Sequence, residues 1–85
     1  MDSQKLVMEL NDMFWNLEND QEELAHEMLG LMSENQETVQ FDSALQKAFR
    51  ELNIWSRTEE NTGVVLGVVR DLLGFKRNNT HKERN

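Results

Sequence analysis

The sequence predicts an all-α fold: a compact bundle of four amphipathic helices with a short basic C-terminal tail. Two observations lead to this fold class. Apolar residues recur every three or four positions in four separate segments, which is the period of a helix, and no segment shows the sustained alternation of a half-buried strand. The 85 residues include no Pro and only four Gly, so little interrupts these segments.

The length and composition indicate a single small domain. We assign residues 1–75 to the bundle and residues 76–85 to the tail, which has no apolar periodicity and is expected to be disordered. A chain this short buries only roughly 60–65% of its unfolded surface, so its core is small. The absence of Cys fits a reducing compartment, and the first ten residues lack the apolar run of a signal peptide. We therefore expect a cytoplasmic protein.

The first helix is expected from Ser3 to Leu17, with Asp2 or Ser3 as its N-cap. Its main apolar stripe comprises Leu6, Val7, Leu10, Met13, Phe14 and Leu17. Met8 and Trp15 lie on a second line, apart from this stripe. They either pack against a neighbouring helix or form an exposed patch, and Met and Trp are common in adaptable binding surfaces.

The second helix is expected from Asp20 to Ser33, capped by Asn19 or Asp20. Its apolar face comprises Leu24, Ala25, Met28, Leu29, Leu31 and Met32. On the polar face, Glu23 and His26 have the Glu-x-x-His spacing of di-iron ligands, but the chain has no second pair of this kind. We expect both side chains to face solvent, with no metal and no cofactor bound.

The third helix has two possible starts. Ser33 and Gln36 form a capping box that predicts a start near Asn35, whereas Asp42 or Ser43 would cap a later one. The segment from Glu34 to Phe41 is therefore left open as loop or helix. The expected core face contains Phe41, Ala44, Leu45, Ala48, Phe49, Leu52 and Trp55, and leaves out Val39 and Ile54.

The most apolar stretch, GVVLGVVRDLLGF, runs from Gly63 to Phe75. It is too short for a membrane span, which needs about 20 apolar residues, and a lone strand would find no partner. It is therefore expected to be a helix that starts near Thr58 or Glu59, with Ser56 and Glu59 as its capping box, and stops at Gly74.

The apolar arc of this fourth helix spans about 200°, which is wider than a surface helix normally needs. Either the helix is central to the bundle or part of the arc covers a copy of the chain or a partner. We expect part of the arc to remain exposed in a lone subunit. The residues expected to contribute are Val64, Leu66, Val68, Leu73 and Phe75. Gly63 and Gly67 form a G-x-x-x-G, which we interpret as a close approach of helices inside the bundle rather than a dimer motif.

The charge of −7 is unevenly distributed, because residues 1–75 contain 15 acids and 5 bases while residues 76–85 contain 4 bases and 1 acid. Seven acids occur between positions 9 and 27 with no base among them: Glu9, Asp12, Glu18, Asp20, Glu22, Glu23 and Glu27. Such a surface repels nucleic acid, which is bound by clustered Lys and Arg. It favours a protein partner with a basic surface.

The chain contains no Cys nucleophile, no phosphate-binding loop and no H-E-x-x-H motif, so we do not expect an enzyme. We expect a protein-binding module, a small regulator or inhibitor. Its expected contacts are the seven acids together with five apolar residues: Met8, Trp15, Leu66, Leu73 and Phe75. The alternatives are a nucleic-acid mimic that occupies the DNA- or RNA-binding site of its target, a homodimer or larger homo-oligomer formed through the fourth helix and, last, an uncharacterised enzyme.

Overall fold

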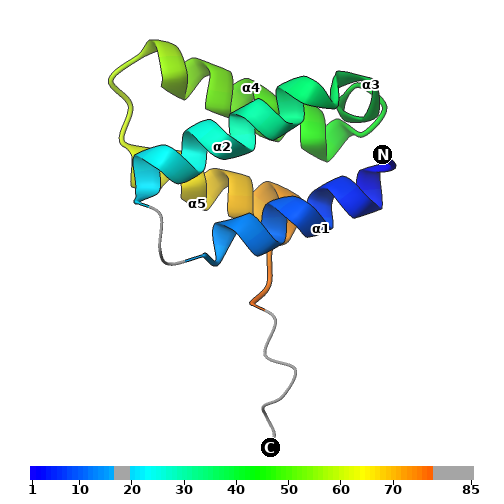
Figure 1. Cartoon of the computed structure of the whole chain (residues 1–85). Coiled ribbons are helices and arrows are strands. Elements are labelled where there is room, and N and C mark those ends of the chain that lie inside the picture. Colours follow the sequence, from blue (N-terminus) through cyan, green and yellow to red (C-terminus); the bar gives the residue numbers. More distant parts are fainter. Residues whose placement is uncertain (17–19, 78–85) are drawn as a thin grey trace, which may run out of the picture.

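The computed structural model describes residues 1–16 and 20–77, which fold into a helical bundle (Figure 1). The helices are α1 (Ser3–Phe14), α2 (Gln21–Glu34), α3 (Gln36–Val39), α4 (Ser43–Arg57) and α5 (Thr62–Leu73). Within the described residues there is no strand, and α3 is a single turn. The predicted all-α bundle of four amphipathic helices is confirmed, with one short helix added between the second and the third.

A side-chain cap begins each of the four long helices. The side chains of Asp2, Asp20, Asp42 and Asn61 each accept a hydrogen bond from the backbone N–H three residues later, at 2.8 to 3.1 Å. Each bond satisfies a donor that the helix itself leaves free. The capping residues thus fix where the chain turns into each helix.

The core lies where α2 packs on α4 and α5, which pack against each other, and α1 also contacts α2 (Figure 1). The buried residues are Leu6, Leu10, Leu24, Ala25, Met28, Met32, Val39, Leu45, Ala48, Leu52, Trp55, Val65, Leu66, Val69 and Phe75. No polar or charged residue is buried among the described residues, so the core is held by apolar packing alone.

The segment between α2 and α4 uses both of the starts that were considered for the third helix. Asn35 precedes the single turn of α3, and Asp42 caps α4. The expectation that Phe41 faces the core is wrong: Phe41 lies in the turn between α3 and α4 and is 85% exposed. Val39, which the helical pattern excluded, is buried in its place, because α3 turns that side chain toward the bundle.

The start of the last helix is also corrected. α4 continues to Arg57, and α5 begins at Thr62 after the Asn61 cap, so Ser56 and Glu59 do not form a capping box. The Ser56 hydroxyl instead donates to the Asn53 carbonyl at 2.8 Å. The extended segment between the helices is fixed by the Trp55 indole N–H, which donates to the Thr62 hydroxyl at 3.0 Å.

The predicted end of α5 at Gly74 is confirmed. Gly74 adopts φ 66°, and the next N–H, of Phe75, bonds the Arg70 carbonyl at 3.0 Å. This left-handed conformation is one that L-residues with a Cβ adopt at a cost. Lys76, expected to belong to the tail, pairs instead with the side chain of Asn11 through its backbone N–H and C=O, both at 3.0 Å. Residues 78–85 lie outside the described residues.

The end of α1 and the role of the G-x-x-x-G glycines also differ from expectation. α1 stops at Phe14, where the Asn16 N–H closes the last turn on the Met13 carbonyl at 3.1 Å, and Leu17 lies outside the described residues. The interpretation of the G-x-x-x-G as a close approach of helices is wrong at Gly67, because a Cβ added there would meet nothing within 4 Å, whereas a Cβ at Gly63 would lie 3.6 Å from the side chain of Gln21 in α2.

Candidate partner-binding surface

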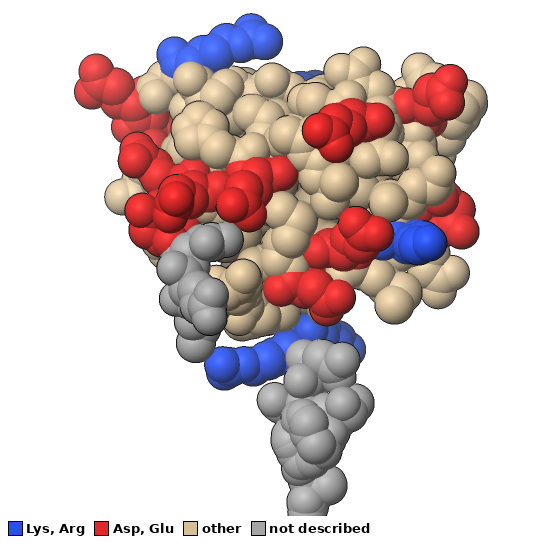
Figure 2. All heavy atoms as spheres, in the orientation of Figure 1, with Lys and Arg blue, Asp and Glu red and all other residues tan. Residues whose placement is uncertain are grey.

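The acids of α1 and α2 lie on the outer surface of the bundle. Asp12, Glu22, Glu23 and Glu27 are exposed, Asp20 is the exposed N-cap of α2, and Glu9 is partly exposed. Figure 2 shows carboxylate side chains spread over this face and gathered at the end where α2 begins. Glu18 lies outside the described residues, so its predicted role stays a prediction.

The connection between α4 and α5 brings two further acids to this end. Glu59 and Glu60, which had been expected in the first turn of a helix, lie in the extended segment after α4. Together with Glu22 of α2 they line a hollow of about 330 Å³, whose wall includes His26 and Trp55. We call this site, formed by Glu22, His26, Trp55, Glu59 and Glu60, the acidic pocket.

Packing of α2 against α4 places the aromatic wall of the pocket. The His26 and Trp55 rings lie 4.7 Å apart between centroids at an interplanar angle of 56°. Trp55 is buried, and its indole N–H is satisfied by Thr62, so the ring is held in place. His26 is exposed and covers the ring from the solvent side. Glu23 and His26 face solvent, as predicted.

The carboxylates of the pocket form no ion pair in the described part of the chain. The Arg70–Asp71 pair lies on α5, and Arg57 at the end of α4 forms no ion pair with Glu22, Glu59 or Glu60. No Lys or Arg occurs between Lys5 and Lys47. Like charges held together without a counter-charge repel each other, and exposure to water reduces this cost but does not remove it. A cation from outside the chain would therefore be stabilised in the acidic pocket.

The five apolar residues predicted as contacts do not form one surface. Met8 is 61% exposed on α1, while Trp15 and Leu73 are partly buried against the core. The expectation of exposure is wrong for Leu66 and Phe75, which are 4% and 7% exposed. Leu66 belongs to the core cluster, and Phe75 packs on the Phe14 ring at 5.2 Å between centroids.

Val64 and Val68, the other residues of the predicted exposed arc, agree with the expectation. Val64 is 57% exposed, and Val68 is partly exposed. Only the edge of the arc therefore faces solvent.

The described residues contain no group of three or more His, Cys, Asp or Glu side chains arranged to hold a metal ion. No helix among them is both long enough and apolar enough to cross a bilayer. Comparison with protein-family models, with curated proteins and with solved structures finds no match to the chain.

Sequence reasoning found the acids of α1 and α2 but missed the contribution of Glu59 and Glu60. Both residues were assigned to a helix start, where acids are common because of the helix dipole. The Asn61 side chain caps α5 and so places both acids before the helix, but Ser, Thr and Asn all suit a cap, so the sequence alone does not separate these starts.

Proposed function

We propose that the protein is a small binding module that docks through its acidic face on a basic surface of a partner protein and regulates or inhibits it. The observation that supports this proposal is the acidic pocket, in which Glu22, Glu59 and Glu60 share one hollow and form no ion pair among the described residues. Complementary charge speeds encounter and fixes the orientation of docking.

The chemistry of the pocket favours an Arg or Lys side chain as the first contact. An Arg guanidinium pairs with carboxylates and also stacks on aromatic rings, and the pocket offers both through its three acids and the His26–Trp55 wall. Outside the pocket, Asp12, Glu23 and Glu27 extend the negative surface over α1 and α2. A basic patch on the partner would meet the pocket first and then this wider face.

Capture of partners from the native host tests the proposal. The test variant carries Glu22→Gln, Glu59→Gln and Glu60→Gln, and the matched control carries the same change at Glu34, Glu37 and Glu51, which lie outside the pocket. Both lose three charges, so they differ only in where the charge is removed. The tag belongs on the C-terminus, since the backbone carbonyl of Met1 accepts a hydrogen bond from Thr38.

We expect at least one protein to be retained by the wild type and the control and reduced at least about tenfold by the pocket variant, as loss of charge-assisted pairs predicts. Equal capture by all three forms would contradict the proposal. Equal loss from both variants would show that net charge alone drives capture, which also contradicts a role for the pocket.

The same experiment separates the proposal from a nucleic-acid mimic. If the captured partner binds DNA or RNA, a short duplex added in excess should displace the module from a mimic's site and leave a separate docking site occupied. The mimic remains an alternative that this competition decides.

A further inference from the structure

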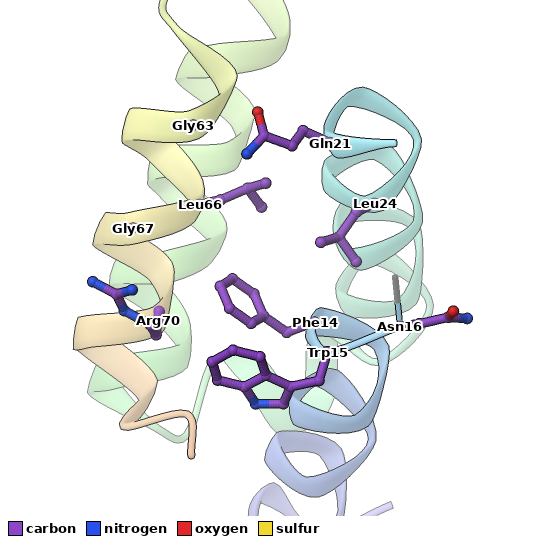
Figure 3. A pocket seen from close by; sticks show the side chains of 9 residues that line it. All are labelled: Phe14, Trp15, Asn16, Gln21, Leu24, Gly63, Leu66, Gly67 and Arg70. Atoms are coloured by element: carbon purple, nitrogen blue, oxygen red, sulfur yellow. The ribbon is translucent and has the colours of Figure 1, made fainter. Parts of the chain in front are cut away.

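An apolar groove lies between the end of α1, the start of α2 and one side of α5. It measures about 320 Å³, and Phe14, Trp15, Leu24, Leu66, Gly67 and Arg70 are among its lining residues. Figure 3 shows Leu24 and Leu66 pointing toward each other across the space, with the two aromatic rings beside them. The groove is distinct from the acidic pocket, with which it shares no lining residue.

Gly67 lines this groove without a side chain. A Cβ at Gly67 would meet nothing within 4 Å, so a larger residue there has open space around it. Glycine inside a helix lowers stability relative to alanine, and close packing of helices does not explain it here. The bare backbone of α5 leaves room for a group from outside the chain.

The most exposed aromatic side chain among the described residues lies elsewhere on the molecule. Phe41 is 85% exposed in the turn between α3 and α4. The residues on either side of this turn, Val39 and Leu45, are buried in the core. Hydrogen bonds from the Phe41 and Asp42 N–H groups to the Thr38 and Val39 carbonyls, both at 3.2 Å, close the turn. Phe41 therefore cannot turn inward without pulling a neighbour out of the core.

The charges beside the two features are opposite. The charged groups that line the hollow next to Phe41 are the Asp2 and Glu37 carboxylates and the α-amino group of Met1, which leaves a net negative charge. The one charged residue that lines the groove is Arg70, and the Arg77 guanidinium lies 5.8 Å from the Trp15 ring centroid. Arg70 is paired with Asp71 at 3.4 Å, but both side chains are largely exposed, so the pair is weak.

We propose that Phe41 of one copy of the chain inserts into the groove of a second copy. A space of about 320 Å³ holds one aromatic side chain, which would lie against Phe14 and Trp15 in edge or offset contact. Asp2 and Glu37 then approach Arg70 and Arg77 at the rim. The inference is independent of the proposed docking function, because it uses neither the acidic pocket nor a foreign partner.

The geometry makes this contact head-to-tail. The hollow beside Phe41 includes Met1 and Ser3 at the start of α1, whereas the groove includes Phe14 and Trp15 at its end. The two features thus lie at opposite ends of α1, so Phe41 does not occupy the groove of its own chain. A contact between two different patches leaves one groove and one Phe41 free on every pair of chains. Further copies therefore add to the pair in the same way.

Sedimentation of the purified chain at concentrations from about 10 µM to 1 mM tests the proposal. This concentration range suits a contact with one main anchor. The ionic strength is set at about 0.15 M, where the Debye length is about 8 Å, so that repulsion between acidic copies is screened. We expect the mean mass of the wild type to rise with concentration. Phe41→Ser and Gly67→Leu should each weaken association at least about tenfold, because one removes the inserted ring and the other fills the groove.

Gly30→Leu is the matched control, since Gly30 is also a helical glycine whose Cβ would meet nothing within 4 Å, yet it lies outside the groove. It should associate like the wild type. All three variants should keep the helical circular dichroism of the wild type, because each change is at an exposed or open position.

Mixing the two defective variants gives the sharpest result. The Phe41→Ser chain has an intact groove and the Gly67→Leu chain an intact ring, so an equal mixture should form a one-to-one dimer that does not grow. A wild type that stays monomeric over the whole range overturns the proposal. So does association that survives Phe41→Ser or Gly67→Leu, or a mixture that remains monomeric.

Discussion

Neighbouring side chains on the same helix differ sharply in their burial. Val64 and Leu66 both belong to the apolar arc predicted for the last helix, yet Val64 is exposed and Leu66 is buried. Periodicity shows which side of a helix is apolar, but it does not show how many neighbours lie against that side. The sequence therefore predicted a surplus of apolar surface on α5 without identifying the residues that provide it.

This difference leads to a prediction about stability. Leu66→Ala should lower the free energy of unfolding by about 2–5 kcal/mol, because it removes buried contacts and leaves a cavity. Val64→Ala should cost less than about 1 kcal/mol, since the side chain already contacts water. Urea denaturation followed by circular dichroism measures both. Similar losses for the two variants would contradict the assigned burial.

Helix starts were predictable where the candidate caps were adjacent residues. The expected caps were Asp2 or Ser3 and Asn19 or Asp20, and Asp2 and Asp20 are the caps found. Before α5 the sequence offers Ser56, Thr58 and Asn61, and local preference does not decide among them. The length of α4 and the bond from Trp55 to Thr62 decide, and both depend on how the helices pack.

The start of α5 can be tested through its cap. Asn61→Ala should lower the free energy of unfolding by about 0.5–2 kcal/mol, because the Val64 N–H loses its acceptor. Ser56→Ala is the control and should change it by no more than about 0.5 kcal/mol, as expected for an exposed residue that caps no helix. If Ser56→Ala has the larger effect in denaturant unfolding, α5 starts earlier than described here.

Replacement by alanine should change the stability in opposite directions at Gly67 of α5 and at Gly74, the C-cap of this helix. Gly74→Ala should destabilise by about 1–2 kcal/mol, because Gly74 adopts a left-handed conformation. Gly67→Ala should stabilise by about 0.5–1 kcal/mol, because Gly67 is helical and has open space around it. Thermal and urea unfolding of the pair measure both signs. Destabilisation by Gly67→Ala would indicate a close contact at that position.

At the scale of the whole molecule, the sequence predicted the fold class, the four long helices and the acidic character of α1 and α2. It did not predict the acidic pocket, because Glu22 and the pair Glu59 and Glu60 are far apart in the chain. Packing of α2 against α4 and α5 brings them together, and a single sequence does not reveal which helix faces meet. The exposure of Phe41 was missed for a related reason. Phe41 has the helical spacing of the α4 core face, but it lies in the turn before α4.

The acidic pocket has a predicted effect on stability as well as on binding. Replacing Glu59 and Glu60 by Gln should raise the unfolding midpoint slightly at low salt, because it relieves repulsion from Glu22. The gain should shrink as salt screens the charges. A midpoint that falls, or a gain that does not depend on salt, would show that these acids are stabilised by contacts within the chain.

Docking of the acidic face on a basic partner is tested most directly by the association rate measured against ionic strength. With the captured partner, raising salt from about 50 to 500 mM shortens the Debye length severalfold. We predict that association of the wild type slows markedly while dissociation changes little, and that the variant of Glu22, Glu59 and Glu60 shows a weaker salt dependence. An association rate that stays constant over this range, or the same dependence for the variant, would contradict docking through the acidic face.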